Sequence, residues 1–298
     1  MKVRIGLGLG TATPVNDAER FGPFVDQLEA LGFDSLWLSE RLTGPAPDPL
    51  IALAFAAART TKLKLGTSVL VVPGRNPVVL AKELASLDRL SNGRLLPAMG
   101  LGAPVPVEHR AFGVDRKERA ALFDEALGLM RRLWTEDHVT HDGVRFHVED
   151  VTLRPRAVQE PLEVWLGGQA PSELRRTGRM GDGWLPSFCT VADVANGWKV
   201  ITDVAEQHGR EIDPEHLGTL IPYCGTAVPD VVAQVVAARR PGVEVTDVVA
   251  VGLDGLERRV HELIGAGASK FVVVPVEEPT GWDQELAGLA ERLKPLET

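Results

Sequence analysis

This chain has few cysteines and few aromatic residues, and its basic residues are outnumbered by acidic ones. Two of its 298 residues are cysteine, one is tyrosine, and aromatic residues make up 5% of the total. Two distant cysteines without a CxxC pair give neither a disulfide framework nor a structural zinc site. The 32 lysine and arginine residues are outnumbered by 41 acidic residues, for a net charge of −9. This charge argues against nucleic acid or an anionic membrane as the main partner.

Long hydrophobic segments are also lacking. The longest apolar run, residues 50–58, is much shorter than the roughly 20 residues that cross a bilayer. The first residues include two basic side chains but no long apolar core and no clear cleavage site, so we expect a strand there rather than a signal peptide. We therefore expect a cytoplasmic protein with reduced thiols and no membrane partner.

Strand and helix patterns alternate along the whole chain, and no Ser/Gly-rich linker divides it. Such alternation is typical of a parallel sheet covered by helices. Eight such units in this length predict a single (β/α)8 TIM barrel domain over residues 1–298. The eight predicted strands are residues 3–9, 33–38, 64–72, 95–99, 162–166, 183–185, 219–223 and 271–274.

A doubly wound open sheet is the alternative to a barrel. It normally shows a GxGxxG turn after the first strand, whereas Gly6, Gly8 and Gly10 alternate within the predicted strand. We interpret these glycines as thinning the barrel wall where a large group packs. Pro97 inside the fourth strand predicts a local bulge, because proline donates no ladder hydrogen bond.

Three histidines, His138, His141 and His147, lie on a predicted β-hairpin at residues 138–148, inserted before the fifth strand. Clustered histidines are compatible with a metal site. No strand-end carboxylate converges on them, however, so the pattern favours an exposed polar hairpin and no metal.

In a barrel, functional residues lie where the strands end and the following loops begin. The predicted ends are rich in glycine, which lets a large flat ligand approach the backbone. They contain no Ser-His-Asp set, HExxH motif or lysine. These ends are Gly10-Thr11, Ser39-Glu40-Arg41, residues 72–76, Gly100-Leu101-Gly102, Gly167-Gly168-Gln169-Ala170, residues 182–184, Tyr223 and residues 275–277.

Two of these ends suggest polar sites, each with a simpler alternative. The turn at residues 167–170 precedes a helix, so its free N–H groups predict an anion site; an ordinary tight turn is the alternative. Glu40 and Arg41 are either an ion pair at the barrel rim or a pair that polarises a ligand.

Two further groups of charged or titratable residues lie outside the strand ends. His109, in the loop after the fourth strand, is either an acid–base group facing the barrel mouth or a surface histidine. Arg119 and Glu125, on the next helix, are most simply explained as a solvated or rim ion pair.

Several stretches together resemble the bacterial luciferase-like oxidoreductase family. They are LGFDSLW at residues 31–37, residues 60–95, residues 119–135 ending in Leu-Trp-Thr, and VWLGG at 164–168 followed by GDGW at 181–184. The resemblance covers the whole chain and is closest to the branch that uses the deazaflavin coenzyme F420, although the FMN branch shares most of the pattern. It implies a (β/α)8 barrel with an inserted segment near the cofactor.

The resemblance also implies which residues contact that cofactor. Ser68-Val69 matches a third-strand position where the family often holds a non-proline cis peptide against the ring. Gly100, Leu101 and Gly102 match a backbone segment beside the cofactor, and Glu40 matches an acidic contact. Gly167, Gly168, Gln169 and Ala170 match the phosphate-binding turn.

Two positions depart from the family pattern. Dehydrogenases of this family that act on alcohols and sugar phosphates usually carry a histidine where Arg41 stands, and often a glutamate where Ala103 stands. A guanidinium cannot accept a proton at neutral pH. We therefore take Glu40, Arg41 and His109 as the catalytic candidates, and expect hydride transfer between F420 and a small organic substrate. Arg41 favours the reducing direction, or binding of a polar or anionic substrate, over oxidation of an alcohol.

Other functions stay open from the sequence. One alternative is an FMN-dependent monooxygenase, and another is a barrel that binds flavin without turnover. A non-redox phosphate-binding barrel, such as an isomerase, lacks a supporting base–electrophile pair. For partners we expect a small-molecule substrate and a homodimer, since oligomers of the family bury helices of the outer ring.

Overall fold

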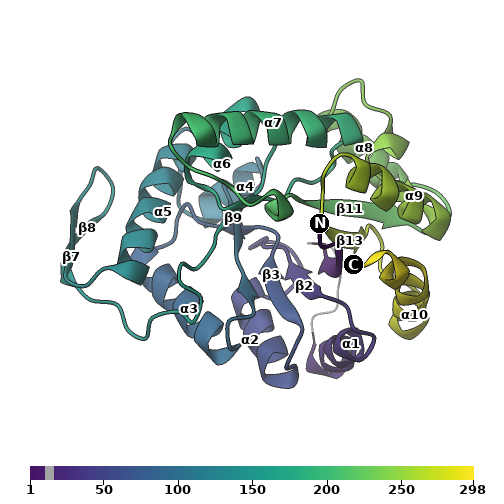
Figure 1. The fold of residues 1–298 in the computed structure, drawn as a ribbon, viewed down its shortest axis with the longest axis horizontal. Helices are drawn as coiled ribbons and strands as arrows, with labels where there is room; N and C mark the ends of the chain where they lie inside the picture. Colours follow the sequence, from purple (N-terminus) through teal and green to yellow (C-terminus); the bar gives the residue numbers. More distant parts are fainter. Residues whose placement is uncertain (11–16) are drawn as a thin grey trace.

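The computed structural model describes residues 1–10 and 17–298, and its central strands are surrounded by helices (Figure 1). Every pairing among these central strands is parallel. The strands are β1 (Arg4–Leu9), β2 (Ser35–Leu38), β3 (Lys64–Thr67), β4 (Leu70–Val71), β5 (Leu95–Leu96), β6 (Ala98–Gly100), β9 (Trp165–Leu166), β10 (Gly183–Trp184), β11 (Gly218–Cys224), β12 (Ala250–Val251) and β13 (Lys270–Pro275).

These strands close into a barrel. One sheet has the order β12-β11-β13-β1-β2-β3-β5, and the other has the order β10-β9-β6-β4. The chain runs directly from β3 into β4 and from β5 into β6, which joins the two sheets on one side. Parallel bridges from Trp184 to Leu217 and from Ser187 to Leu220 join β10 to β11 on the other. The predicted (β/α)8 barrel is therefore confirmed.

Two local irregularities separate β3 from β4 and β5 from β6. The peptide bond between Ser68 and Val69 is cis, as the resemblance implies. Pro97 lies between the other two strands, so the strand is interrupted where a bulge was predicted. The Thr67 hydroxyl compensates there, because it accepts from Ala98 N at 3.0 Å and donates to Ala98 O at 2.7 Å.

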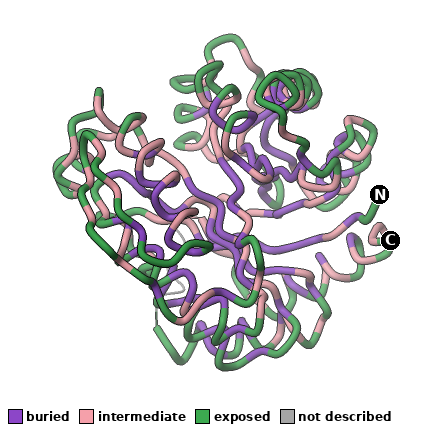
Figure 2. The backbone as a smooth tube through the Cα atoms, turned by 60° about the vertical axis from the view of Figure 1, so that its left-hand side comes forward, coloured by how far each residue is buried: buried purple, intermediate pink, exposed green. Residues whose placement is uncertain are grey.

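The helices cover the outside of the barrel, and the buried residues gather between them and the strands (Figure 2). Two of them begin at a proline preceded by a capping side chain: Asp48 accepts from two N–H groups of α2, and Asn76 does the same for α3. The outer helices are α1 (Ala18–Ala30), α2 (Pro49–Arg59), α3 (Pro77–Leu90), α5 (Arg119–Thr135), α6 (Pro171–Met180), α7 (Val191–Gln207), α8 (Asp230–Arg239), α9 (Gly252–Gly265) and α10 (Trp282–Leu293). None of the helices in the described ranges is long and apolar enough to cross a bilayer.

An antiparallel pair, β7 (Val139–Asp142) with β8 (His147–Val151), projects away from the barrel at the left of Figure 1. The three histidines in and beside these strands each contact a different carboxylate. A ring nitrogen of His138 lies 2.6 Å from Asp150 Oδ1, one of His147 lies 2.7 Å from Asp142 Oδ1, and one of His141 lies 3.1 Å from Glu125 Oε1. Within residues 1–10 and 17–298, no group of three or more histidine, cysteine or acidic side chains is placed to hold a metal ion.

Two short elements of the structure are not predicted from the sequence. The strand β12 has two residues, and the helix α4 (Pro106–Ala111) has six. Neither is long enough to show a hydrophobic period, which is the signal that sequence reasoning depends on. The helix α4 replaces the predicted loop around His109, so that residue lies on a helix.

Two tryptophans, Trp37 on β2 and Trp165 on β9, fill the barrel interior, with ring centroids 6.5 Å apart. Glycines on the neighbouring strands make room for them. A Cβ on Gly66 would lie 2.2 Å from Trp37 Cε3, and a Cβ on Gly183 would lie 2.5 Å from Trp165 Cδ2. A Cβ on Gly6 would lie 2.3 Å from Ser35 Oγ and 3.0 Å from Trp37 Nε1, so Gly6 leaves room for Ser35 as well as for the indole.

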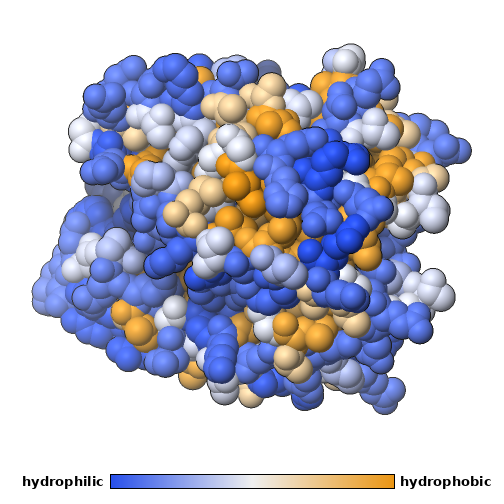
Figure 3. All heavy atoms as spheres, turned by 45° about the vertical axis from the view of Figure 1, so that its right-hand side comes forward, coloured by the Kyte–Doolittle hydropathy of each residue, from blue (hydrophilic) through white to orange (hydrophobic). Residues whose placement is uncertain are grey.

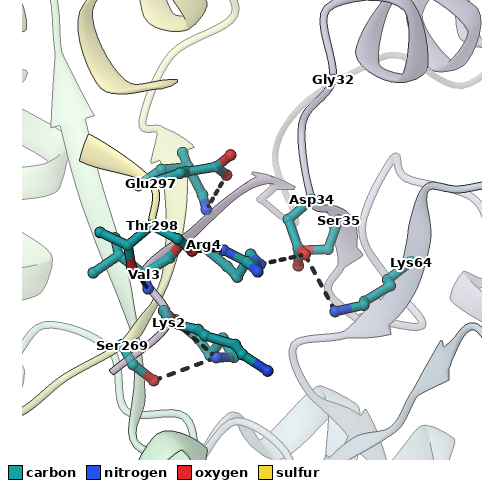
Figure 4. Close-up of polar contacts among 12 residues, drawn as sticks. Lys2, Val3, Arg4, Gly32, Asp34, Ser35, Lys64, Ser269, Glu297 and Thr298 are labelled. Carbon is teal, nitrogen blue, oxygen red and sulfur yellow. Dashed lines mark hydrogen bonds and ion pairs between the residues drawn. The ribbon is translucent and has the colours of Figure 1, made fainter. Parts of the chain in front are cut away.

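At the amino-terminal ends of the strands, charged and polar groups hold β1 in place (Figure 4). Asp34 lies 3.7 Å from Arg4 and 3.2 Å from Lys64. The last residues of the chain return to the same edge, where Val3 N donates to Thr298 Oγ1 at 3.0 Å and Ile5 N donates to Glu297 Oε1 at 2.9 Å. This end of the barrel is therefore bound together by ion pairs and the returning tail.

The tryptophan packing predicts the effect of adding one methyl group. Gly66→Ala would force a Cβ into the Trp37 ring, so we expect the free energy of unfolding to fall by about 1–3 kcal/mol in urea denaturation. Gly128→Ala is the matched control, because nothing lies within 4 Å of its Cβ position and it sits inside α5. We expect the control to be stabilised by about 0.5–1 kcal/mol. Equal stabilities for the two variants would contradict this packing argument.

Candidate active site

A cavity of about 650 Å³ opens at the carboxyl ends of the barrel strands. Every predicted catalytic or cofactor-contacting residue except Ala170 lines it, whereas the predicted strand ends at residues 72–76, residues 182–184 and Tyr223 do not. The predicted residues that line it are Glu40, Arg41, Ser68, Val69, Gly100, Leu101, Gly102, His109, Gly167, Gly168 and Gln169. Of the predicted pair Gly10-Thr11, Gly10 also lines the cavity and Thr11 lies outside the described residues. Eleven expected residues from five separate chain segments thus share one space.

The floor of the cavity is formed by backbone and by the Val69 side chain. A Cβ on Gly100 would lie 2.7 Å from Val69 Cγ2, and a Cβ on Gly167 would lie 2.8 Å from Val69 Cγ1. Both distances are too short for real carbon contacts, so only glycine fits on either side of Val69. The result is a largely apolar floor with exposed peptide groups around it.

Glu40 is a buried carboxylate with two firm partners. Its side chain is 2% exposed, accepts from Val71 N at 2.6 Å, and pairs with the Arg75 guanidinium. Burial raises the pKa of the Glu40 carboxyl, and Arg75 and the Val71 N–H oppose that increase. Glu40 thus links the end of β2 to the loop after β4.

Glu40 and Arg41 do not form the ion pair that was one interpretation of the sequence. Arg41 Nε instead lies 3.9 Å from Glu108 Oε1, and its side chain is 41% exposed. Consecutive residues of an extended segment point in opposite directions, so neighbours in sequence reach different partners.

Glu108 is a site residue that the sequence interpretation missed. Its carboxylate is buried and accepts from Leu42 N and Thr43 N, each at 3.0 Å, and from the Thr43 hydroxyl. Burial would raise the pKa of Glu108, but these bonds and Arg41 outweigh it and lower the pKa. Glu108 therefore fastens α4 to the loop after β2. An acidic residue beside His109 is the one signal that pointed to it.

Arg119 reaches into the cavity and contacts His109. Its Nη1 donates to Leu101 O at 3.2 Å and Gly102 O at 3.0 Å, and lies 3.1 Å from His109 Nε2. A guanidinium has no acceptor, so His109 Nε2 accepts and the neutral ring carries its proton on Nδ1. The interpretation of Arg119 and Glu125 as an ion pair is wrong, because Glu125 bonds the β7–β8 hairpin through Phe146 N at 2.9 Å.

Arg119 also retains an unused donor. Its Nε is buried and has no hydrogen-bond partner among the described residues. Buried polar groups are nearly always satisfied in folded proteins, so an orphan donor on a cavity wall indicates where an acceptor from a ligand would bind.

The turn at residues 167–170 already holds a carboxylate. The N–H groups of Gln169 and Ala170 donate to Glu173 Oε2 at 3.0 and 2.9 Å, and Gly168 adopts a φ of +91°. Glu173 is the third residue of α6, the position that closes a capping box, and that spacing was the available signal. An anion that used the same N–H groups would have to displace Glu173.

The Glu40–Arg75 pair predicts a stability effect. Arg75→Met would leave Glu40 buried without its cation, so we expect the free energy of unfolding to fall by about 3 kcal/mol at pH 8. Without Arg75 the folded-state pKa of Glu40 rises further, so the protonated form tolerates burial and the deficit shrinks as the pH falls toward 5. Urea denaturation at both pH values measures this. Glu40→Gln combined with Arg75→Met should recover part of the loss, and a deficit independent of pH would contradict the assignment.

Comparison with known proteins agrees with this architecture. The family model described as luciferase-like monooxygenase matches residues 2–268. An F420-dependent glucose-6-phosphate dehydrogenase from Intrasporangium calvum is 38% identical over 186 residues, which cover 56% of this chain and 55% of the relative. The chain spans about half the length of the curated relatives it matches.

Solved structures share the fold over nearly the whole chain. The monooxygenase RslO1 from Streptomyces bottropensis has a TM-score of 0.80 at 24% identity, covering 98% of this chain and 99% of its own. An F420-dependent secondary alcohol dehydrogenase in complex with an F420-acetone adduct has a TM-score of 0.81 at 18% identity, covering 100% of each chain. Because the family model spans most of its length, this chain belongs to the luciferase-like monooxygenase family.

Proposed function

We propose that this protein is an oxidoreductase that binds coenzyme F420 and catalyses hydride transfer between the deazaflavin and a small organic substrate. The observation that carries the proposal is the strand-end cavity, which combines an apolar floor at Val69 with the free, buried Nε of Arg119. A flat ring system with a phosphate needs these two features together. The relative named as F420-dependent supports the deazaflavin.

The residues present fit such a cofactor. Val69, Gly100 and Gly167 would hold its ring, since the two glycines leave room for the Val69 side chain, which forms the apolar floor between them. Arg119 and the turn at residues 167–170 would hold its phosphate. When bound, the deazaflavin supplies or accepts the hydride, which is the chemistry that side chains cannot provide.

The remaining residues would bind and orient the substrate. Arg41 cannot accept a proton, but it can polarise an oxygen, and Glu108 limits where it points. His109 holds a proton on Nδ1 because Arg119 donates to its other nitrogen. Glu40, tied to Arg75, supports the floor rather than the substrate. This arrangement favours donating hydrogen bonds to a carbonyl oxygen over removing a proton from an alcohol.

FMN is the alternative cofactor, because the same floor and the same free donor suit a flavin. The RslO1 monooxygenase shares the fold and favours this second candidate. Titration with each cofactor separates the two, with absorbance changes at about 420 nm for F420 and about 450 nm for FMN. We expect F420 to bind more tightly; binding of FMN alone would overturn the proposed cofactor.

Two variants test the phosphate contacts. Arg119→Met should weaken F420 binding about tenfold or more, because a charged hydrogen bond is lost, and should leave binding of the deazaflavin without its phosphate unchanged. Glu173→Gln should strengthen F420 binding, because it removes a negative charge that competes for the same N–H groups.

The control is Glu149→Gln, an exposed residue on β8 that should change neither affinity. Fluorescence titration of F420 and of its phosphate-free form measures all variants. If Glu173→Gln and Arg119→Met affect both ligands equally, the phosphate is held elsewhere.

Arg41 predicts the direction of the reaction. We expect the wild type to reduce carbonyl compounds with reduced F420 much faster than it oxidises alcohols or sugar phosphates with oxidised F420. Arg41→His should raise alcohol oxidation by roughly a hundredfold, since an imidazole can act as the base. Arg41→Lys is the control that keeps the charge without adding a base. Efficient alcohol oxidation by the wild type that is lost in Arg41→Ala would show that Arg41 has a different role.

The expected homodimer and cytoplasmic location stay predictions. We propose a homodimer on the basis of the resemblance, and size-exclusion chromatography with light scattering would measure the mass in solution.

A further inference from the structure

We propose that the substrate of this protein is an uncharged and largely apolar carbonyl compound that packs against α8, and that sugar phosphates are not its substrates. The inference rests on the proposed function, because it assumes that the ring occupies the cavity floor. It adds the chemical class of the second ligand in the same cavity.

The cavity has two unlike sides. One side carries the polar groups of α5 and α6, among them Arg119, Arg176 and Glu173. The other side is formed by Val231, Val232 and Val235 of α8 together with Pro275 and Val276 at the end of β13. The polar side suits the phosphate of the cofactor, which leaves the apolar side for the substrate.

Two of the four valines of α8, Val231 and Val235, are not buried by the fold. Val231 is 66% exposed and Val235 is 37% exposed, although both line a cavity. Within α8 only Val236 is buried in the core. A surface helix normally carries polar residues on its outer face, whereas this one is apolar on most sides. The face of the molecule toward α8, α9 and α10 shows apolar patches between hydrophilic side chains (Figure 3). A bound apolar molecule would cover such a surface and gain its burial energy.

A sugar phosphate would find few partners there. Four charged residues on the cavity wall are already engaged: Glu40 with Arg75, Glu108 with Thr43, Arg176 with Asp124, and Arg240 with Asp193. No lysine is among the described residues that line the cavity; Arg239 and Arg240 line it at the end of α8, and Arg239 is exposed to solvent. Burying a phosphate dianion and several hydroxyl groups without partners is strongly unfavourable.

The chemistry of this substrate class balances with the residues present. The carbonyl carbon gains two electrons with the hydride, and its oxygen takes a proton from solvent while it accepts a hydrogen bond from Nδ1–H of His109. The product is an alcohol, and the coenzyme is left oxidised. The only reductant required is the reduced F420 of the proposed function.

Equilibrium binding of a ketone series tests the inference. We would measure dissociation constants by calorimetry for 2-butanone, 2-hexanone and 2-octanone, with glucose 6-phosphate as the charged comparison, with and without F420. We expect affinity to rise about threefold to fourfold for each added methylene, the value for burial of a CH₂ group. We expect no measurable binding of glucose 6-phosphate.

Variants of α8 locate the contact. Val235→Asp should weaken 2-octanone binding about tenfold or more, because a carboxylate would enter an apolar contact. It should leave the F420 affinity unchanged within about twofold. Val144→Asp is the control, since Val144 is 84% exposed between β7 and β8, and should change neither.

The outcomes separate the two proposals. If the protein does not bind F420 but its affinity for ketones still rises with chain length, the proposed cofactor is wrong and the proposed substrate class stands. Ketone affinity that does not depend on chain length, tight binding of glucose 6-phosphate, or equal effects of Val235→Asp and Val144→Asp would each overturn the substrate class.

Discussion

The packing of Trp37 and Trp165 inside the barrel is the constraint on which the rest of the structure depends. The two rings occupy the interior at the level where Gly66 and Gly183 face them, so no side chain can replace these glycines without displacing an indole. With the interior filled, a ligand can reach the barrel only from one of its ends. Ion pairs and the returning tail bind the amino-terminal end together, and the carboxyl end carries the large cavity.

Paired charges then hold the loops around that cavity. Glu40 binds Arg75 and Val71 N, which joins the loops after β2 and β4, and Glu108 binds Leu42 N and Thr43 N, which joins α4 to the loop after β2. These buried carboxylates are satisfied within the protein, so they act as supports for the site. The groups left with free capacity are the Arg119 Nε, the Nδ1 proton of His109 and the exposed valines of α8. Their chemistry therefore differs along the cavity, from a cationic donor on α5 to an apolar surface on α8.

Most of the barrel could be predicted from local patterns. Each of the eight predicted strands overlaps a barrel strand, because a buried parallel strand is a short apolar run bounded by turn residues and needs no knowledge of its neighbours. Prolines after Asp48 and Asn76 marked two helix starts for equally local reasons. The strand β12 and helix α4 escaped prediction because two or six residues show no period. Because α4 was not predicted, the position of His109 on that helix and its contact with Arg119 were not predicted either.

The sequence alone determined the fold class, the end of the barrel that carries the site and the members of the glycine-lined floor, since these follow from alternation and from the family resemblance. It did not determine which charged groups pair. Glu40 meets Arg75 from 35 residues away rather than its neighbour Arg41, and Glu125 meets the hairpin rather than Arg119. An ion pair depends on distances between side chains of different loops, and these distances exist only once the barrel has closed. Only the tertiary structure, therefore, decided which donors and apolar surfaces remain free for ligands.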